Sequence, residues 1–123
     1  MWPAENVSKE WAIARLTAAI KALAMSPAEQ IKYVDSELMH HPEELALQFE
    51  DAVVMVPQLL QEGVIRPNIL GIVADIGGIF DTHSGLEGSQ FWTEQAISVD
   101  PDWQRIRDLA GKADMMMNGQ SAD

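Results

Sequence analysis

An apolar run at residues 69–80 constrains the fold of this chain most, because Asp75 is its only charged residue. Its bulky side chains recur at the spacing of one helical face, and they are Ile69, Ile72, Val73, Ile76, Ile79 and Phe80. The opposite face carries Gly71, Ala74 and Gly78 besides Asp75. Each glycine costs a helix about 1 kcal/mol relative to alanine, so we expect neighbouring elements to pack around this helix. A buried strand is the alternative, but the period-two alternation of a strand is absent.

Proline and capping residues predict where the neighbouring helices begin and end. The Ser-Pro-Ala-Glu sequence at residues 26–29 has the pattern of a capping box and predicts a helix that ends near Met39. Pro42, followed by two glutamates, predicts a third helix that ends at Gly63. Pro57 lies within this third helix, where proline removes a backbone hydrogen bond. The sequence therefore predicts either a kink or a restart at Pro57.

The remaining segments predict a helix at each end of the chain and a loop after the apolar run. Residues 4–24 carry one apolar stripe and many alanines, which is typical of a core helix. Residues 81–92 are rich in glycine and serine and predict a loop. Thr93 can cap a short helical turn, and Asp100 can cap the last helix.

These elements together predict an all-α, single-domain, compact helical bundle. We expect about five to six helices around a buried, glycine-containing central helix. With 123 residues the chain is long enough to bury one hydrophobic core. The helical domain is expected to span residues 1–112, and residues 113–123 are expected to form a frayed C-terminal tail.

Composition excludes several classes of protein. The chain has no cysteine, which removes disulfides, thiol catalysis and thiolate metal sites. No apolar run approaches the length of a membrane span. Residues 1–11 lack the basic start and apolar centre of a secretory signal. We therefore expect a cytoplasmic protein.

The net charge of −11 is concentrated in the middle of the chain. Between Tyr33 and Gln104 there are thirteen acidic residues and one cation, Arg66, which together carry a net charge of −12. Nucleic acids and anionic membranes attract cationic proteins, so we expect neither as a partner. A basic protein is the natural partner, because opposite charges speed encounter and select partners. The alternative is that the acids only keep the protein soluble.

The predicted third helix has an outward face that mixes acidic and apolar residues. Leu47 and Val54 lie among acids on neighbouring positions, an arrangement typical of a docking face for a basic and partly apolar surface. The alternative is that another helix of the bundle buries Leu47 and Val54. With two acids from the preceding helix, the candidate partner-binding residues are Asp35, Glu37, Glu43, Leu47, Glu50, Asp51 and Val54.

No pattern in the sequence predicts a catalytic or cofactor site. His40 and Glu44 are four residues apart, as in many helical metal pairs, but Pro42 intervenes and places His40 before the helix. His41 and His83 would join a metal site only if the fold brought them to it. No nucleophile elbow surrounds a serine, and no glycine-rich phosphate loop is present. We therefore predict no enzymatic activity, no catalytic residue, no cofactor and no metal site.

The chain resembles a known class of small acidic proteins. Its segments FWTEQA at residues 91–96 and DWQRIR at residues 102–107 look like the ends of bacterial proteins of this kind. In its size, its acidity and its acid-rich helix after a first helical hairpin, it resembles the immunity proteins of bacterial toxin systems. This resemblance implies an inhibitor that binds a basic toxin domain and occludes its active site or its nucleic-acid-binding surface. Immunity proteins span unrelated folds, so the resemblance implies no particular fold.

We therefore expect an acidic protein-binding module that acts as an immunity-type inhibitor. The first alternative is a self-associating structural or adaptor protein, a homodimer that uses the face formed by Gly71, Ala74 and Gly78. In any of these cases, Asp75 is either exposed or paired with Arg66 or with a cation of a partner. The second alternative is a metal-dependent helical enzyme that uses the three histidines and nearby carboxylates.

Overall fold

The computed structural model describes residues 9–84 and 90–117, and this part of the chain contains helices and no strand. The elements in chain order are α1 (Lys9–Ala24), α2 (Pro27–Glu37), α3 (Glu43–Val53), α4 (Val56–Gln61), α5 (Pro67–His83), the 3₁₀ turn η2 (Gln90–Trp92), α6 (Glu94–Val99) and α7 (Pro101–Met117). They form one compact arrangement, so the prediction of an all-α, single-domain fold is confirmed. No helix among the described residues is both long enough and apolar enough to cross a membrane.

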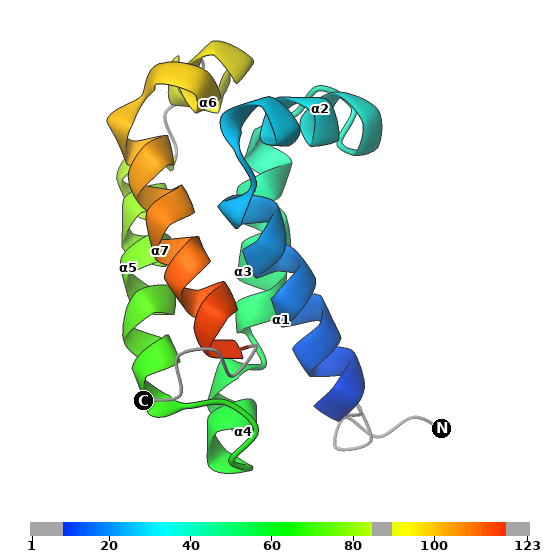
Figure 1. Cartoon of the computed structure of the whole chain (residues 1–123), viewed down its shortest axis with the longest axis vertical. Helices are drawn as coiled ribbons and strands as arrows, with labels where there is room; N and C mark the ends of the chain where they lie inside the picture. The colour runs from blue at the N-terminus through cyan, green and yellow to red at the C-terminus, as the bar shows by residue number, and fades with distance from the viewer. Residues whose placement is uncertain (1–8, 85–89, 118–123) are drawn as a thin grey trace.

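Four helices, α1, α3, α5 and α7, form the body of the bundle and run alternately up and down (Figure 1). Helix α1 packs against α7 and α3, and α5 packs against α7. The other α-helices, α2, α4 and α6, lie at the two ends of this body. Helices α2 and α6 contact each other at one end, and α4 lies at the opposite end.

Helix α5 is buried on one face only. Ile69, Val73, Ile76 and Phe80 face the core, whereas Gly71, Ala74, Asp75 and Gly78 are exposed. The helix is therefore not surrounded on all sides, and its small-residue face points outward rather than against a neighbour. Burial of the four bulky side chains, at roughly 1.5–3 kcal/mol each, outweighs the cost of the glycines.

The predicted helix starts are confirmed where caps or prolines mark them. The Ser26 hydroxyl accepts a hydrogen bond from the Glu29 amide, and the Glu29 carboxylate accepts one from the Ser26 amide, so the capping box is complete. Thr93 caps α6 through a hydrogen bond from the Ala96 amide. Pro57 does not kink one long helix but lies in the first turn of α4, so the predicted third helix is split into α3 and α4.

Two predicted boundaries are wrong. Asp81 to His83 belong to α5 and not to the following loop. Helix α7 continues to Met117, so residues 113–117 are not part of a frayed tail. Ala113 is fully buried, and Lys21 of α1 forms an ion pair of 3.1 Å with Asp114, so contacts with the rest of the bundle hold this last turn in place. Residues 1–8, 85–89 and 118–123 lie outside the described part, as does the start of the helix expected at residue 4.

An aromatic cluster joins the start of α7 to the end of α5. The Trp103 indole donates to the Phe91 carbonyl at 2.8 Å, and the Trp92 indole donates to the His83 carbonyl at 3.1 Å. The Phe91 and Trp103 rings stack with their centroids 4.7 Å apart, and Phe80 meets Trp103 edge-on at 5.8 Å. The indole N–H groups of the buried Trp103 and the partly buried Trp92 therefore both have partners, which is the condition for burying tryptophan without a large penalty.

A buried polar network ties α2 and α6 to the body of the bundle. Gln30 and Arg107 are only 0% and 6% exposed, and the Arg107 guanidinium donates to the Gln30 side-chain oxygen at 2.8 Å. It also donates to the Ile97 carbonyl in the last turn of α6 at 3.0 Å. The Gln30 amide nitrogen donates to the carbonyls of Ala22 and Leu23 in the last turn of α1. These carbonyls are among those that a helix end leaves without an intrahelical partner.

We expect Gln30→Leu to lower the free energy of unfolding by about 2–4 kcal/mol, because it leaves two buried carbonyls and one guanidinium N–H without a partner. Urea denaturation measures this loss. The matched control is Gln104→Leu, which removes an exposed partner of the same guanidinium and costs about 1 kcal/mol or less. Equal losses in the two variants would show that the buried hydrogen bonds of Gln30 contribute no more to the free energy of unfolding than the exposed ones of Gln104.

The buried end of α7 can be tested separately. Ala113→Asp places a carboxylate in the core and should lower the free energy of unfolding by about 3 kcal/mol or more. The control is Met115→Asp, at an exposed position two residues away, where the cost should be about 1 kcal/mol or less. If both variants were as stable as the parent protein in urea denaturation, the last turn of α7 would be frayed after all.

Candidate functional site

The outward side of α3 carries a continuous row of exposed acidic and aliphatic side chains. At 100° per residue these side chains lie within an arc of about 100°, opposite the buried Leu45, Phe49 and Ala52. We call this row the acidic α3 strip, and it consists of Glu43, Leu47, Glu50, Asp51 and Val54.

The two aliphatic members of the strip are open to solvent. Leu47 is 47% exposed and Val54 is 72% exposed. The alternative expectation, that another helix of the bundle buries them, is therefore wrong. Exposed aliphatic side chains are ordinary when single, but two on one helix face with three carboxylates around them form the kind of mixed surface found at protein interfaces.

Asp35 and Glu37, the other two candidate partner-binding residues, lie on α2. Both are exposed, and Glu37 is the last residue of the helix. Asp35 interacts with His40 and Glu94 rather than with the acidic α3 strip. The structure thus brings together four of the seven candidates on α3 and a fifth, Val54, at its C-cap, and it places Asp35 in a separate group.

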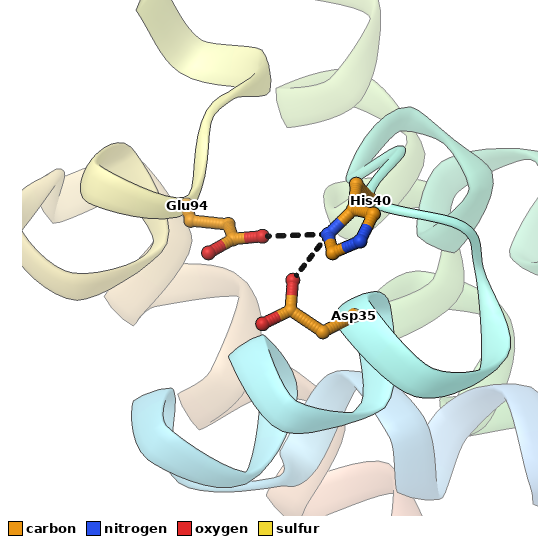
Figure 2. A group of neighbouring side chains, drawn as sticks. All are labelled: Asp35, His40 and Glu94. Carbon is orange, nitrogen blue, oxygen red and sulfur yellow. Dashed lines mark hydrogen bonds and ion pairs between the residues drawn. The ribbon is translucent and has the colours of Figure 1, made fainter.

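The second group joins two carboxylates and an imidazole from three segments of the chain. His40 Nδ1 lies 2.9 Å from Asp35 Oδ1 and 3.8 Å from Glu94 Oε2. Figure 2 shows the three side chains pointing toward one another from α2, from the turn after α2 and from the start of α6. We call this group the Asp35–His40–Glu94 cluster. One potential ligand atom from each residue lies within 4.8 Å of the other two.

The backbone places His40 beside Asp35. After α2 the chain passes through two left-handed residues, Met39 with φ 53° and His40 with φ 68°. The amides of Leu38 and His40 both donate to the Val34 carbonyl, at 3.1 and 3.0 Å, which closes the end of the helix. Non-glycine residues occupy this region at a cost, so the turn is held by these contacts rather than by its residue types.

The two carboxylates of the cluster differ in proton affinity. A hydrogen bond with Glu94, and then one with His40, holds the pKa of Asp35 below its usual value. The same interaction with Asp35 raises the pKa of Glu94 above its usual value. The hydrogen bond between the two carboxyl groups thus favours the ionised form of Asp35 and the protonated form of Glu94. Two carboxylates held this close leave a place that a cation can occupy.

The other two histidines do not join this cluster. His41 Nδ1 lies 3.9 Å from Glu43 Oε2, and the His83 Nε2 lies 2.9 Å from Asp102 Oδ2. The His83 ring stacks on Phe91 with centroids 3.7 Å apart, which fixes it beside the aromatic cluster. The three histidines are therefore at separate places, and the enzyme alternative that needs them together has no common site in the described structure.

Spacing in the sequence did not point to this cluster. It suggested Glu44 as a partner for His40, whereas the observed partners are Asp35, five residues before it, and Glu94, 54 residues after it. The contact between α2 and α6 brings Glu94 close, and no local pattern encodes that contact. The cap at Thr93 was the available signal, because it predicts where the helix that carries Glu94 begins.

Comparisons with known proteins add no relative to these observations. No protein-family model, no curated protein and no solved structure matches this chain. The resemblance to immunity proteins therefore stays a prediction from the sequence. The exposed acidic α3 strip and the Asp35–His40–Glu94 cluster are the structural features that bear on function.

Proposed function

We propose that this chain is an acidic protein-binding module that docks a basic, partly apolar surface of a partner protein through the acidic α3 strip. The observation that carries the proposal is the exposure of Leu47 and Val54 among three carboxylates on one side of a regular helix. In a complex, the aliphatic side chains supply apolar area that water leaves, and the carboxylates around them supply charge complementarity.

The charge of the whole molecule supports the same kind of partner. The segment from Tyr33 to Gln104 carries a net charge of −12, and α3 lies within it. Such a field attracts a basic protein over a distance of about 10 Å at moderate salt and speeds its encounter with the strip. Specific contacts with Leu47 and Val54 then determine how long the complex lasts, because affinity differences lie mostly in dissociation.

Inhibition of a toxin domain is the form of this function that the resemblance to immunity proteins implies. A toxin that acts on nucleic acid needs a basic surface for phosphate groups. A rigid helix that presents three carboxylates can cover such a surface and exclude its substrate. The α3 helix suits this task because its inner face is anchored in the core through Leu45 and Phe49.

The double variant Glu50→Lys/Asp51→Lys should lose the partner. In affinity capture from the native host at low salt, we expect the parent chain to retain one basic protein in stoichiometric amount and to release it at high salt. The variant should retain at least about tenfold less, because two attractive contacts become repulsive. Unchanged circular dichroism would show that the variant keeps the helical content of the parent chain.

The matched control changes the same charge on another helix. Asp75→Lys/Asp81→Lys alters two exposed acids of α5 and gives the same net charge. Retention by this control, together with loss in the α3 variant, supports a docking site on the strip. Equal loss in both variants would mean that overall acidity, and not the acidic α3 strip, attracts the partner.

Self-association through α5 is the second candidate. Gly71, Ala74 and Gly78 lie on an exposed face, and a Cβ atom built at either glycine meets nothing within 4 Å. Leu70, which is exposed beside this face, adds apolar area. Two such faces can approach closely because they lack large side chains.

Sedimentation equilibrium at high protein concentration decides between the two candidates. Self-association predicts a dimer mass that Ala74→Glu returns to the monomer value, because the new side chain adds bulk and like charge to both faces. Gln95→Glu, at an exposed position of α6, has the same net charge and should leave the dimer intact. A monomer mass for the parent chain at the highest concentration rules out this candidate.

A further inference from the structure

We propose that Asp35, His40 and Glu94 form a binding site for one divalent transition-metal ion of the Zn²⁺ type. The site is distinct from the acidic α3 strip, and the inference does not depend on the proposed docking function. It rests on the kinds of donor atom, on the distances between them and on the way that three segments of the chain converge.

The donor set suits a transition metal better than calcium or magnesium. An imidazole nitrogen is a preferred ligand of Zn²⁺ and its neighbours in the first transition row, whereas Ca²⁺ and Mg²⁺ take oxygen ligands. Two ionised carboxylates balance the two positive charges of the ion. The presence of His40 between Asp35 and Glu94 is what separates this cluster from an ordinary group of surface acids.

The distances already approach those of a coordination sphere. In a tetrahedral Zn²⁺ site with metal–ligand distances of about 2.0–2.1 Å, neighbouring ligand atoms lie about 3.3 Å apart. The His40 nitrogen lies 2.9 Å from the Asp35 oxygen and 3.8 Å from the Glu94 oxygen, values on either side of that distance. Rotamer adjustments of exposed side chains are enough to place an ion among them.

The fold brings these ligands together before an ion arrives. Asp35 is fixed on α2, His40 follows it in a turn closed by two hydrogen bonds to Val34, and Glu94 is the first residue of α6, after the Thr93 cap. Figure 2 shows that the three ligands come from different segments and face a common point. An ion at this point would join α2 to α6 directly and stabilise the end of the bundle that they form.

Residues 9–84 and 90–117 contain no second group of potential ligands of this kind. Among these residues, this is the one group of three potential ligands whose donor atoms all lie within 4.8 Å of one another. The pairs His41–Glu43 and His83–Asp102 offer two ligands each. With three protein ligands the proposed site leaves one tetrahedral position for water, so it is open and accessible rather than closed.

The experiment titrates Zn²⁺ into metal-free, untagged full-length protein in the presence of excess Mg²⁺, which occupies unspecific carboxylate sites. We expect isothermal titration calorimetry to give one ion per chain and the melting temperature to rise by about 5 °C at saturation. The His40 imidazole resonances should shift on binding, while those of His41 and His83 stay in place. Absence of binding tighter than about 100 µM would overturn the proposal.

Single variants assign the ion to these ligands. His40→Ala and Glu94→Gln should each weaken Zn²⁺ binding at least about tenfold. His41→Ala removes the neighbouring exposed histidine and should leave the affinity unchanged. An equal loss in His41→Ala, or no loss in the two ligand variants, would place the ion elsewhere and overturn the proposal. Each variant is first checked for parent-like circular dichroism, and all three changes are at surface positions.

Discussion

The buried hydrogen bond between Arg107 and Gln30 is the interaction on which the placement of α2 and α6 depends. Within the described structure, the Arg107 guanidinium donates to neutral oxygens of Gln30, Ile97 and Gln104 and to no carboxylate. Burial lowers the pKa of Arg107, and the nearby charge of Asp108 opposes that effect. A buried cation is tolerated only when its donors are satisfied. Gln30 of α2 and Ile97 of α6 supply two of these acceptors, and the last turn of α1 holds Gln30 in place through two hydrogen bonds. The ends of α1, α2 and α6 must therefore meet around α7.

The Asp35–His40–Glu94 cluster follows from that core network. Because Gln30 ties α2 to α1 and Arg107 ties α6 to α7, the exposed sides of α2 and α6 are also brought together. Asp35 lies five residues after Gln30, and Glu94 lies three residues before Ile97, so both are carried close to each other by groups that are buried. The charge repulsion between the two carboxylates is opposed by the hydrogen bond between them and by their contacts with His40. The Asp35–His40–Glu94 cluster at the surface is therefore a consequence of the buried hydrogen bonds of Gln30 and Arg107.

Local signals in the sequence predicted helix starts well and long-range contacts poorly. The capping box at Ser26 and the cap at Thr93 were predictable because each involves residues three apart. Arg107 was overlooked because a charged residue on a helix is normally exposed, and its partner Gln30 is 77 residues away. Ala113 was assigned to a frayed tail because its neighbours are polar, although it lies three residues after the buried Ala110. Following the apolar spacing from Ala110 through Ala113 to Met117 predicts the longer helix that the structure shows.

Charge alone does not single out a functional face on this molecule. Acids are spread over α2, α3, α5 and α7, and the exposed Asp75 on α5 shows that an acid can simply mark the solvent side. What distinguishes α3 is that exposed Leu47 and Val54 stand in one row with Glu43, Glu50 and Asp51. An acid on the surface is already well solvated and loses hydration when a partner arrives, whereas an exposed aliphatic side chain gains by leaving water. In the proposed complex, the acids would select a basic partner, and the aliphatic side chains between them would provide the favourable free energy of contact.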